Sequence, residues 1–333
     1  QKQKSMGYFF KSKTQSCVIT LLAWSVLGAL DLTPARGAGI TLGALEHDGY
    51  GVVTLKRPLP NMLVVLAEID GRKYNLVVDT GWASDGIALL TDHRGAARGA
   101  TEEIKDSAYS ASGAEIKGMR KGVGQVVEIG NVQVKQVPLI YGNFKGLKDE
   151  FFRRKGGIDG VLGAGFLRNC SAVIDLHNLR LYLRPPGGGH RVALGPALQA
   201  SGLSEVQFAM SENHICIVDV EVNGTPSAMV LDTGAYSAGI DSRMATKLGA
   251  SAIHSRVGSV DAAGKRAESK LMQLKSFKIG GVKVRAPDMR VNSYGFYNAT
   301  GGKVVGLLGM DILGTNGTII DFGSRKLYFY GAQ

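Results

Sequence analysis

The chain has 333 residues, a formal net charge of +11, 46 glycines and 9 prolines. This length leaves room for two domains of ordinary size, each able to bury its own core. The composition indicates many turns without the bias of a disordered chain, and the basic residues form no stripe with interleaved aromatic side chains, so nucleic acid is not an expected partner.

The N-terminal segment has the pattern of an export signal. Four lysines precede an uncharged run from Cys17 to Leu30, and Ala-Arg-Gly-Ala at positions 35–38 offers small residues for cleavage. Such a run is short for a bilayer span but suits the core of a signal peptide. We therefore predict a signal peptide over residues 1–37 and a periplasmic or secreted protein with no stable membrane span after cleavage. An uncleaved N-terminal membrane anchor is the alternative.

A tight turn and an acidic tripeptide are the next features along the chain. Asp70-Gly71 stands between apolar runs, and the second run, residues 76–78, leads directly into Asp79-Thr80-Gly81. Asp-Gly and Asn-Gly are the strongest short signals for a β-hairpin, because both central residues of a type I′ turn need a positive φ. We therefore predict a strand, a tight turn, a second strand and an acid at its end.

The rest of the first half contains short apolar segments separated by turns. A turn-rich segment at residues 109–113 lies about thirty residues after Asp79, and residues 126–134 then alternate as hairpins do. The half ends with a glycine-rich apolar run at residues 160–167, then Val173-Ile174-Asp175 and Arg180-Leu181-Tyr182.

The second half repeats these features in the same order. The spacing from Asn223-Gly224 to Asp232-Thr233-Gly234 equals the spacing from the first turn to the first tripeptide. Residues 306–313 and 319–321 match residues 160–167 and 173–175 at a constant offset of 146. These landmarks indicate an internal duplication, which can bring the two acids together.

Helical periodicity is sparse in both halves. The best candidate is Arg243–Leu248, with Asp241-Ser242 as an N-terminal cap and Gly249 as a stop. Another hairpin pattern runs through residues 277–284. The chain is therefore predicted to be mostly β, with few short helices.

A pair of acids suggests a definite chemistry. Two carboxylates about one hydrogen bond apart do not readily ionise together, so they share one proton over a wide pH range. The ionised member can take a proton from water while the protonated member polarises a substrate carbonyl. This hydrolysis of a peptide bond needs no metal or other cofactor, and the six histidines show no paired metal-ligand spacing.

These motifs resemble those of a two-lobed aspartic protease of the pepsin/retropepsin superfamily, and the pattern is similar to that of bacterial exported proteins with two retropepsin-like units in tandem. The resemblance covers about residues 48–331. It implies an all-β fold of two six-stranded-type β-barrel lobes, residues 48–190 and 200–331, with a cleft between them. It also implies a monomer that hydrolyses a peptide or protein substrate; a site completed between two chains is the less favoured alternative.

The resemblance also implies roles for individual residues. Asp79 and Asp232 would form the catalytic dyad. The dyad would be supported by the neighbouring threonines and glycines, which are Thr80, Gly81, Thr233 and Gly234. Mobile hairpins over the cleft would be supplied by the segments containing Tyr109, Gly113 and Gly264.

One departure from the family pattern supports a rival hypothesis. Trp82 stands three residues after the first acid, where pepsin-like enzymes have Ser or Thr and retropepsins have Ala, whereas Ala235 in the second copy fits the retropepsin pattern. A non-catalytic peptide-binding or envelope scaffold module is therefore the alternative to an endopeptidase.

The cysteines leave two possibilities open. Cys170 and Cys216 lie one in each repeat, so they could form a disulfide between the lobes in an oxidising compartment. They could equally be separate buried thiols that act as small apolar side chains.

Overall fold

The computed structural model describes residues 42–91, 101–105, 108–147, 157–186, 193–249, 251–261 and 263–332. The predicted signal peptide, residues 1–37, lies outside these ranges. Within them, no helix combines the length and the apolar character that a bilayer span requires. The helices are α1 (Gly43–His47), α3 (Ala164–Asn169), α4 (Leu194–Ala200), α5 (Ser242–Ala245), α6 (Phe296–Ala299) and α7 (Met310–Leu313).

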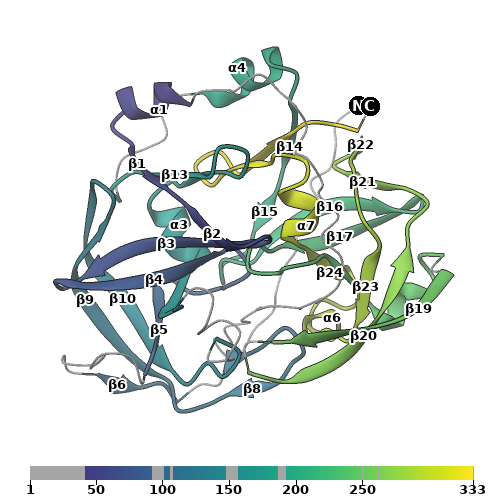
Figure 1. Ribbon diagram of the computed structural model, residues 1–333, viewed down its shortest axis with the longest axis horizontal. Coiled ribbons are helices and arrows are strands. Elements are labelled where there is room, and N and C mark those ends of the chain that lie inside the picture. The colour runs from purple at the N-terminus through teal and green to yellow at the C-terminus, as the bar shows by residue number, and fades with distance from the viewer. Residues whose placement is uncertain are drawn as a thin grey trace.

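The first lobe is built on an eight-stranded sheet, at the left in Figure 1. Its strand order is β2-β3-β4-β11-β5-β10-β9-β6, and an additional pairing of β3 with β9 closes six of these strands into a barrel. A separate hairpin consists of β7 (Ala108–Tyr109) and β8 (Glu115–Ile116). The sheet strands are β2 (Lys56–Leu59), β3 (Met62–Ile69), β4 (Arg72–Asp79), β5 (Ile87–Leu90), β6 (Glu102–Glu103), β9 (Arg120–Ile129), β10 (Val132–Gly142) and β11 (Gly160–Gly163).

The second lobe repeats this arrangement at the right in Figure 1. The order β16-β17-β24-β18-β23-β20 matches β3-β4-β11-β5-β10-β9 of the first lobe, and β21, just after β20, pairs with β16 as β9 pairs with β3. The strands are β15 (Ala209–Met210), β16 (Cys216–Val222), β17 (Thr225–Leu231), β18 (Gly239–Asp241), β19 (Ser251–Val260), β20 (Arg266–Gln273), β21 (Phe277–Ile279), β22 (Val282–Lys283), β23 (Met289–Asn292) and β24 (Val304–Leu308).

A six-stranded sheet joins the two lobes. It contains β1 (Gly51–Thr54), β13 (Arg180–Leu183), β12 (Val173–Asp175), β25 (Ile319–Asp321), β26 (Lys326–Phe329) and β14 (Ser204–Gln207), in that spatial order. The central strands β12 and β25 come from equivalent positions of the two repeats and pair antiparallel. An apolar cluster that includes Leu45 of α1 and Leu198 of α4 packs beside this sheet, and both helices lie at the top of Figure 1.

The two predicted hairpin turns are confirmed by their backbone angles. Asp70 and Gly71 have φ values of 49° and 77°, and Asn223 and Gly224 have values of 49° and 83°. Positive φ at both central residues is the requirement of a type I′ turn. Each turn therefore sets the register of the strand that ends at an acidic tripeptide, β4 in the first lobe and β17 in the second.

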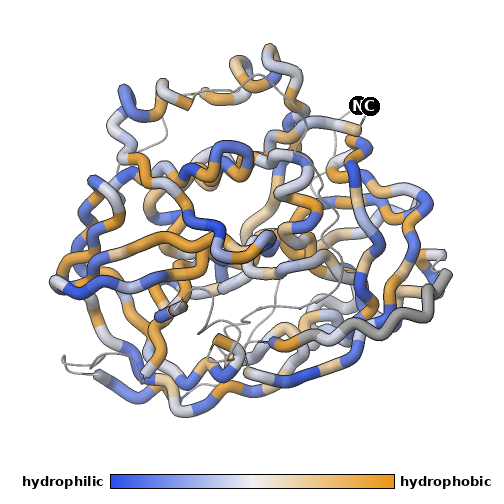
Figure 2. Tube along the Cα trace, viewed as in Figure 1, coloured by the Kyte–Doolittle hydropathy of each residue, from blue (hydrophilic) through white to orange (hydrophobic). Residues whose placement is uncertain are grey.

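The glycine-rich runs form buried strands that lie parallel to these acid-bearing strands. Gly163 of β11 is opposite Asp79 of β4, and Leu308 of β24 is opposite Leu231 of β17. Because apolar residues dominate these strands, the centre of the molecule is largely apolar, as the orange stretches of the inner strands indicate in Figure 2. Each acid is thus attached to a rigid, buried sheet.

The predicted fold class is confirmed: the protein is mostly β, has two lobes and contains few short helices. The predicted helix at Arg243–Leu248 is shorter than expected. Asp241 caps it by accepting a hydrogen bond from the Arg243 N–H, but the regular helix ends at Ala245. The chain continues in turns to Gly249, whose φ of 70° suits a glycine.

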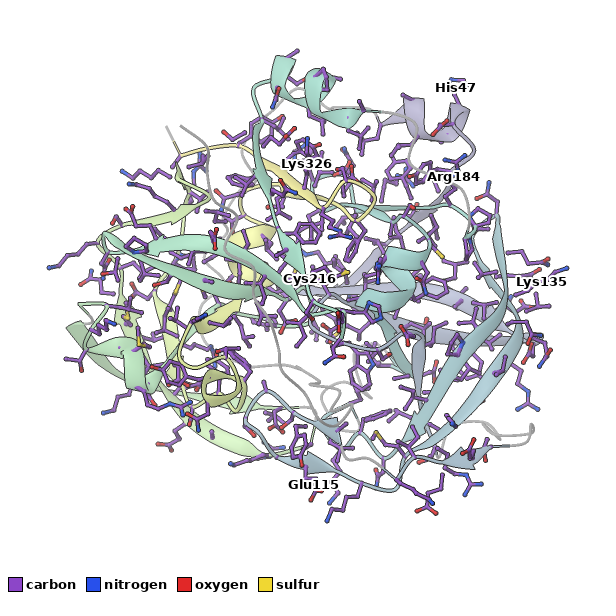
Figure 3. All side chains as sticks on the ribbon, turned by 180° about the vertical axis from the view of Figure 1, so that it is seen from behind. His47, Glu115, Lys135, Arg184, Cys216 and Lys326 are labelled. Atoms are coloured by element: carbon purple, nitrogen blue, oxygen red, sulfur yellow. The ribbon has the colours of Figure 1, made fainter. Side chains whose placement is uncertain are left out.

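Cys170 and Cys216 are two separate buried thiols and do not form a disulfide. Figure 3 places Cys216 in the interior, away from peripheral side chains such as Lys135. Burial raises the pKa of the Cys170 thiol to about 12 and also raises that of Cys216. Neither thiol is therefore ionised or accessible enough to react at neutral pH.

We expect both thiols to resist modification until the protein unfolds. The test uses protein that lacks residues 1–37. A thiol-specific reagent should label neither Cys170 nor Cys216 in the native protein and both in denaturant, because native burial suppresses the reactive thiolate. Intact mass should be unchanged by a reductant. A reductant-dependent gain of two hydrogens would instead show that the two sulfurs are bonded.

Candidate active site

Asp79 and Asp232 occupy equivalent positions at the ends of the parallel strands. The Oδ1 atom of Asp79 accepts hydrogen bonds from the N–H groups of Gly81 (2.8 Å) and Trp82 (3.1 Å). The Oδ1 atom of Asp232 accepts from those of Gly234 and Ala235, both at 2.9 Å. The two loops therefore hold their carboxyl groups in the same way, with one oxygen fixed by two backbone donors.

The two threonines bind the loops to each other. The Thr80 N–H donates to Thr233 Oγ1, and the Thr233 N–H donates to Thr80 Oγ1, each at 3.0 Å. Each hydroxyl also donates to a backbone carbonyl of the opposite lobe, Thr80 to Leu231 and Thr233 to Val78, both at 2.8 Å. These four reciprocal bonds are buried and fix the relative position of the acids.

The glycines of the tripeptides allow the acids to approach. A Cβ atom on Gly81 would lie 2.5 Å from the Asp232 Cγ, and one on Gly234 would lie 2.2 Å from the Asp79 Cγ. Both distances are shorter than carbon–carbon van der Waals contact. Each carboxyl therefore packs directly against the backbone of the opposite loop, which only glycine permits.

Burial and mutual proximity control the protonation of the pair. Neither acid has any exposed surface (0 %). Each carboxyl packs against the glycine of the opposite tripeptide, and neither Oδ2 receives a hydrogen bond from a donor in the described residues. Burial raises the pKa of both carboxyls, and the neighbouring Asp232 charge raises that of Asp79 further. One shared proton would satisfy both outer oxygens.

The glycine-rich runs support the loops from below. The Ala164 N–H donates to the carbonyl of Trp82 (3.0 Å), and the Met310 N–H donates to that of Ala235 (2.9 Å). The repeats differ at one position: Asp311 accepts from the Ala238 N–H (2.8 Å), whereas a Cβ on its counterpart, Gly165, would lie 2.2 Å from the carbonyl oxygen of Ser84. The pKa of Asp311 is raised to about 6 by burial.

Trp82 packs inside the first lobe. Its side chain is fully buried and meets the Phe144 ring edge-on, with the ring centroids 5.0 Å apart. Its Nε1–H donates to Ser84 Oγ (3.2 Å), so the indole is satisfied where it lies. The unusual residue after the first tripeptide is therefore a core residue of its lobe.

The three residues predicted to lie on mobile hairpins belong to two hairpins, one in each lobe. Tyr109 is 37 % exposed and pairs with Glu115 in the β7–β8 hairpin. Gly113, in the turn of that hairpin, and Gly264, in the turn between β19 and β20, both have a φ of 80°. The sequence did not identify Gly295, which contacts Gly113 in the turn of the β7–β8 hairpin. Gly295 lies in a loop with no motif.

A metal site is not evident in the described ranges. They contain no group of three or more His, Cys, Asp or Glu side chains arranged to hold a metal ion. The polar groups gathered at the candidate site are the two acids, the backbone donors that hold them and the hydroxyls of Thr80 and Thr233.

A sequence-family match in the second lobe agrees with the geometry around Asp232. The family model described as aspartyl protease matches residues 218–312. No curated protein matches the chain. Among solved structures, an aspartic proteinase from Irpex lacteus is 14 % identical, with a TM-score of 0.45 over 85 % of this chain and 98 % of that chain. The family match contains Asp232-Thr233-Gly234 and strand β24, so the sequence of the second lobe is similar to that of aspartyl proteases.

Proposed function

We propose that the protein is an aspartic endopeptidase in which Asp79 and Asp232 share one proton and activate a water molecule. The observation that supports this most strongly is the arrangement of the two carboxyl groups. Both are buried, each has one oxygen held by two N–H donors, and the outer oxygens lack donors among the described residues. The aspartyl protease match over the second lobe supports the same assignment.

In the proposed reaction the pair begins with one proton. The ionised carboxylate takes a proton from water as the water oxygen bonds to the peptide carbonyl carbon, and the other carboxyl gives its proton to the carbonyl oxygen. The resulting geminal diol then returns a proton to the pair while the nitrogen receives one and the C–N bond breaks. The pair again holds one proton when the acid and amine products leave.

We further propose that the enzyme is a monomer that acts on peptides or proteins after export. The monomer proposal is supported by the presence of both acids in one chain. Export, to the periplasm or outside the cell, is suggested by the pattern of residues 1–37 alone. Relationship to bacterial exported proteins with tandem retropepsin-like units is likewise part of this proposal.

Trp82 was the residue that suggested a non-catalytic binding module, and its position in the structure does not support that alternative. Trp82 packs within the first lobe, and its N–H donates to Asp79 in the same way as the Ala235 N–H donates to Asp232. The tryptophan therefore does not distort the arrangement of the pair, and a catalytic role is favoured.

The test is cleavage of a mixed peptide library between pH 3 and pH 7 by protein that lacks residues 1–37. We expect cleavage products from the wild type and none above background from Asp79→Asn or Asp232→Asn, because each substitution removes one partner of the proton pair. Equal products from all three proteins would exclude the dyad, and binding of library peptides without products from any of them would support the scaffold alternative.

A further inference from the structure

The turns that precede β3 and β16 occupy equivalent positions in the two lobes. Val64 of β3 and Ile217 of β16 pair with the residues that stand two places before the two acids, in β4 and β17. Asn61 and His214 lie three residues before Val64 and Ile217. The two turns therefore present Asn61 and His214 from equivalent positions.

Both side chains reach the loop that follows the acid of the opposite lobe. Asn61 Nδ2 donates to the Tyr236 carbonyl (2.9 Å), four residues after the second acid. His214 Nε2 contacts Asp85 Oδ1, six residues after the first acid. The first contact joins an amide to a backbone carbonyl, whereas the second joins an imidazole to a carboxylate. The two contacts therefore share a layout but differ in their chemistry.

The loop that carries Asp85, residues 80–86, is short and connects directly to Asp79. Three residues before Asp85, the Trp82 N–H donates to Asp79 Oδ1 (3.1 Å). The same loop packs on α3, where a Cβ on Gly165 would lie 2.6 Å from the Asp85 Cα. Helix α3 thus blocks the loop on one side, and the contact with His214 joins it to the second lobe. A displacement of Asp85 would therefore also shift the backbone donor that holds the first acid.

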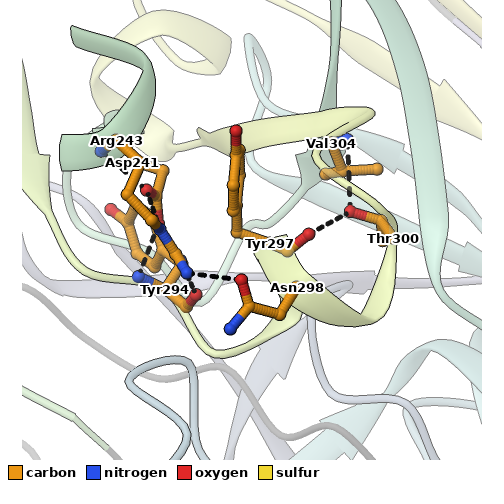
Figure 4. A network of polar contacts seen from close by, with 7 residues as sticks. All are labelled: Asp241, Arg243, Tyr294, Tyr297, Asn298, Thr300 and Val304. Atoms are coloured by element: carbon orange, nitrogen blue, oxygen red, sulfur yellow. Dashed lines mark hydrogen bonds and ion pairs between the residues drawn. The ribbon is translucent and has the colours of Figure 1, made fainter.

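The part of the second lobe that receives this loop is fixed by a polar network. Ala83 of the loop belongs to a buried apolar cluster that includes Ile215 of the β15–β16 turn and Tyr294. The Tyr294 N–H donates to Asp241 Oδ2 (2.9 Å), and the Tyr294 carbonyl accepts from Arg243 (2.7 Å), as Figure 4 shows. Loss of an inter-lobe contact should therefore move the acid loop rather than the surface on which it rests.

The imidazole of His214 depends on Asp85 for one of its two nitrogens. The His214 side chain is 11 % exposed, whereas that of Asp85 is 70 % exposed. Because a carboxylate accepts hydrogen bonds, Nε2 carries a hydrogen and donates it to Asp85. Nδ1 is buried and has no hydrogen-bond partner among the described residues, and the His214 φ of 60° is uncommon for a residue other than glycine. Both features cost free energy, which points to a function for the contact with Asp85.

We propose that His214 is a positioning residue for the first acid. By holding Asp85, it keeps the loop of residues 80–86 against the second lobe and so keeps Asp79 aligned with Asp232. Proton transfer itself belongs to the two acids. The expected effect of His214 on cleavage rests on the proposed peptidase function, whereas its effect on the loop can be measured without a substrate.

Hydrogen exchange tests the effect on the loop in protein that lacks residues 1–37. The N–H groups of Trp82 and Ala235 hold the first and the second acid, so their exchange rates report on the two acid loops separately. We expect His214→Ala to raise the rate at Trp82 by about tenfold or more and the rate at Ala235 by much less. Asn61→Ala should show the opposite preference, because Asn61 contacts the second acid loop. An unchanged rate at Trp82, or an equal rise at both amides in His214→Ala, would overturn the proposal.

Further variants separate this contact from a general loss of stability. His214→Gln keeps an amide donor at the place of Nε2 and should hold the Trp82 rate within about threefold of the wild type. Glu212→Gln is the matched control, because Glu212 is exposed on the same turn, and it should leave the rate unchanged. Asp85→Ala should match His214→Ala, and the double variant should be no faster than either single variant, because all three lack the same contact. Additive effects would show that the two residues act independently and would overturn the proposal.

Kinetics then test the consequence for cleavage. We expect His214→Ala to lower kcat for a peptide about tenfold and to leave KM within about twofold, because a displaced acid loop slows the chemical step. His214→Gln should restore most of kcat. A raised KM with unchanged kcat in His214→Ala would overturn the positioning role. Absence of cleavage by the wild type, together with faster Trp82 exchange in His214→Ala, would refute only the peptidase.

Discussion

Asp232→Asn is expected to make the protein more stable at neutral pH while lowering the rate of peptide cleavage by roughly 10²–10⁴-fold. The loss of activity follows from removal of one partner in the shared-proton pair, since positioned acid–base groups contribute about this factor. The gain in stability follows from burial. The folded protein raises the pKa of this carboxyl, so an ionised Asp232 costs folding free energy that a neutral amide does not.

The direction of the pH dependence follows from this raised pKa. Between the unfolded and folded pKa values the native state binds more protons than the unfolded state, so the free energy of unfolding falls as pH rises through this window. A tenfold difference in proton affinity between the two states corresponds to about 1.4 kcal/mol. We therefore expect Asp232→Asn to gain on the order of 1–3 kcal/mol at pH 7–8, or a few degrees in Tm, and little at pH 4.

Thermal unfolding of both proteins across this pH range provides the measurement. Wild-type Tm should decline from pH 5 to pH 8, and the variant should decline less. A variant that is less stable than the wild type at every pH would show that the buried pair carries no cost of ionisation, which would remove the physical basis of the shared proton.

Gly234→Ala should lower the rate of cleavage by about 100-fold or more and destabilise the fold. The added methyl would lie 2.2 Å from the Asp79 Cγ, and Asp79 cannot retreat without breaking its bonds from Gly81 and Trp82. Overpacking of this kind costs about 1–3 kcal/mol, and displacement of a reacting group by about 1 Å can reduce the rate 10²-fold. Gly81→Ala should act in the same way on Asp232.

Gly43→Ala provides the matched control for this substitution. A Cβ at Gly43 meets no atom within 4 Å, and the residue begins α1, far from the acids in the sequence. Its activity should equal that of the wild type, and its unfolding midpoint in urea should not be lower, because alanine suits a helix better than glycine. Wild-type activity in Gly234→Ala would mean that the two carboxyl groups need not be in contact for cleavage.

The sequence predicts those features of the fold that depend on local chemistry or on the duplication. Asp70-Gly71 and Asn223-Gly224 are local, because positive φ at two adjacent residues is a property of the dipeptide itself. The approach of Asp79 to Asp232 follows from the duplicated order of motifs. The shortened helix after Asp241 was not predictable with the same accuracy, since four helical residues are held mainly by tertiary contacts.

The contact between the β7–β8 turn and the β19–β20 turn lay beyond sequence-based prediction for a physical reason. Ser110 and Asp261 are joined by a hydrogen bond across 151 positions of the chain, and neither belongs to a spacing pattern that indicates contact. Gly295 likewise gives no signal in the sequence, because its importance comes from the approach of Gly113. Similarly, Cys170 and Cys216 gave no local signal to decide between a disulfide and two buried thiols.

Because both halves belong to one polypeptide, the sequence of each half can change independently of the other. In a dimer of identical subunits related by a two-fold axis, the two equivalent hairpin turns would have to carry the same side chains, and a carboxylate would face a carboxylate. Here Ser110 and Ser112 of the β7–β8 turn donate to Asp261 of the β19–β20 turn. Likewise, Gly165 stands where the second half has Asp311. Covalent linkage also keeps the halves together at any dilution, so the specific activity of the protein should be independent of its concentration.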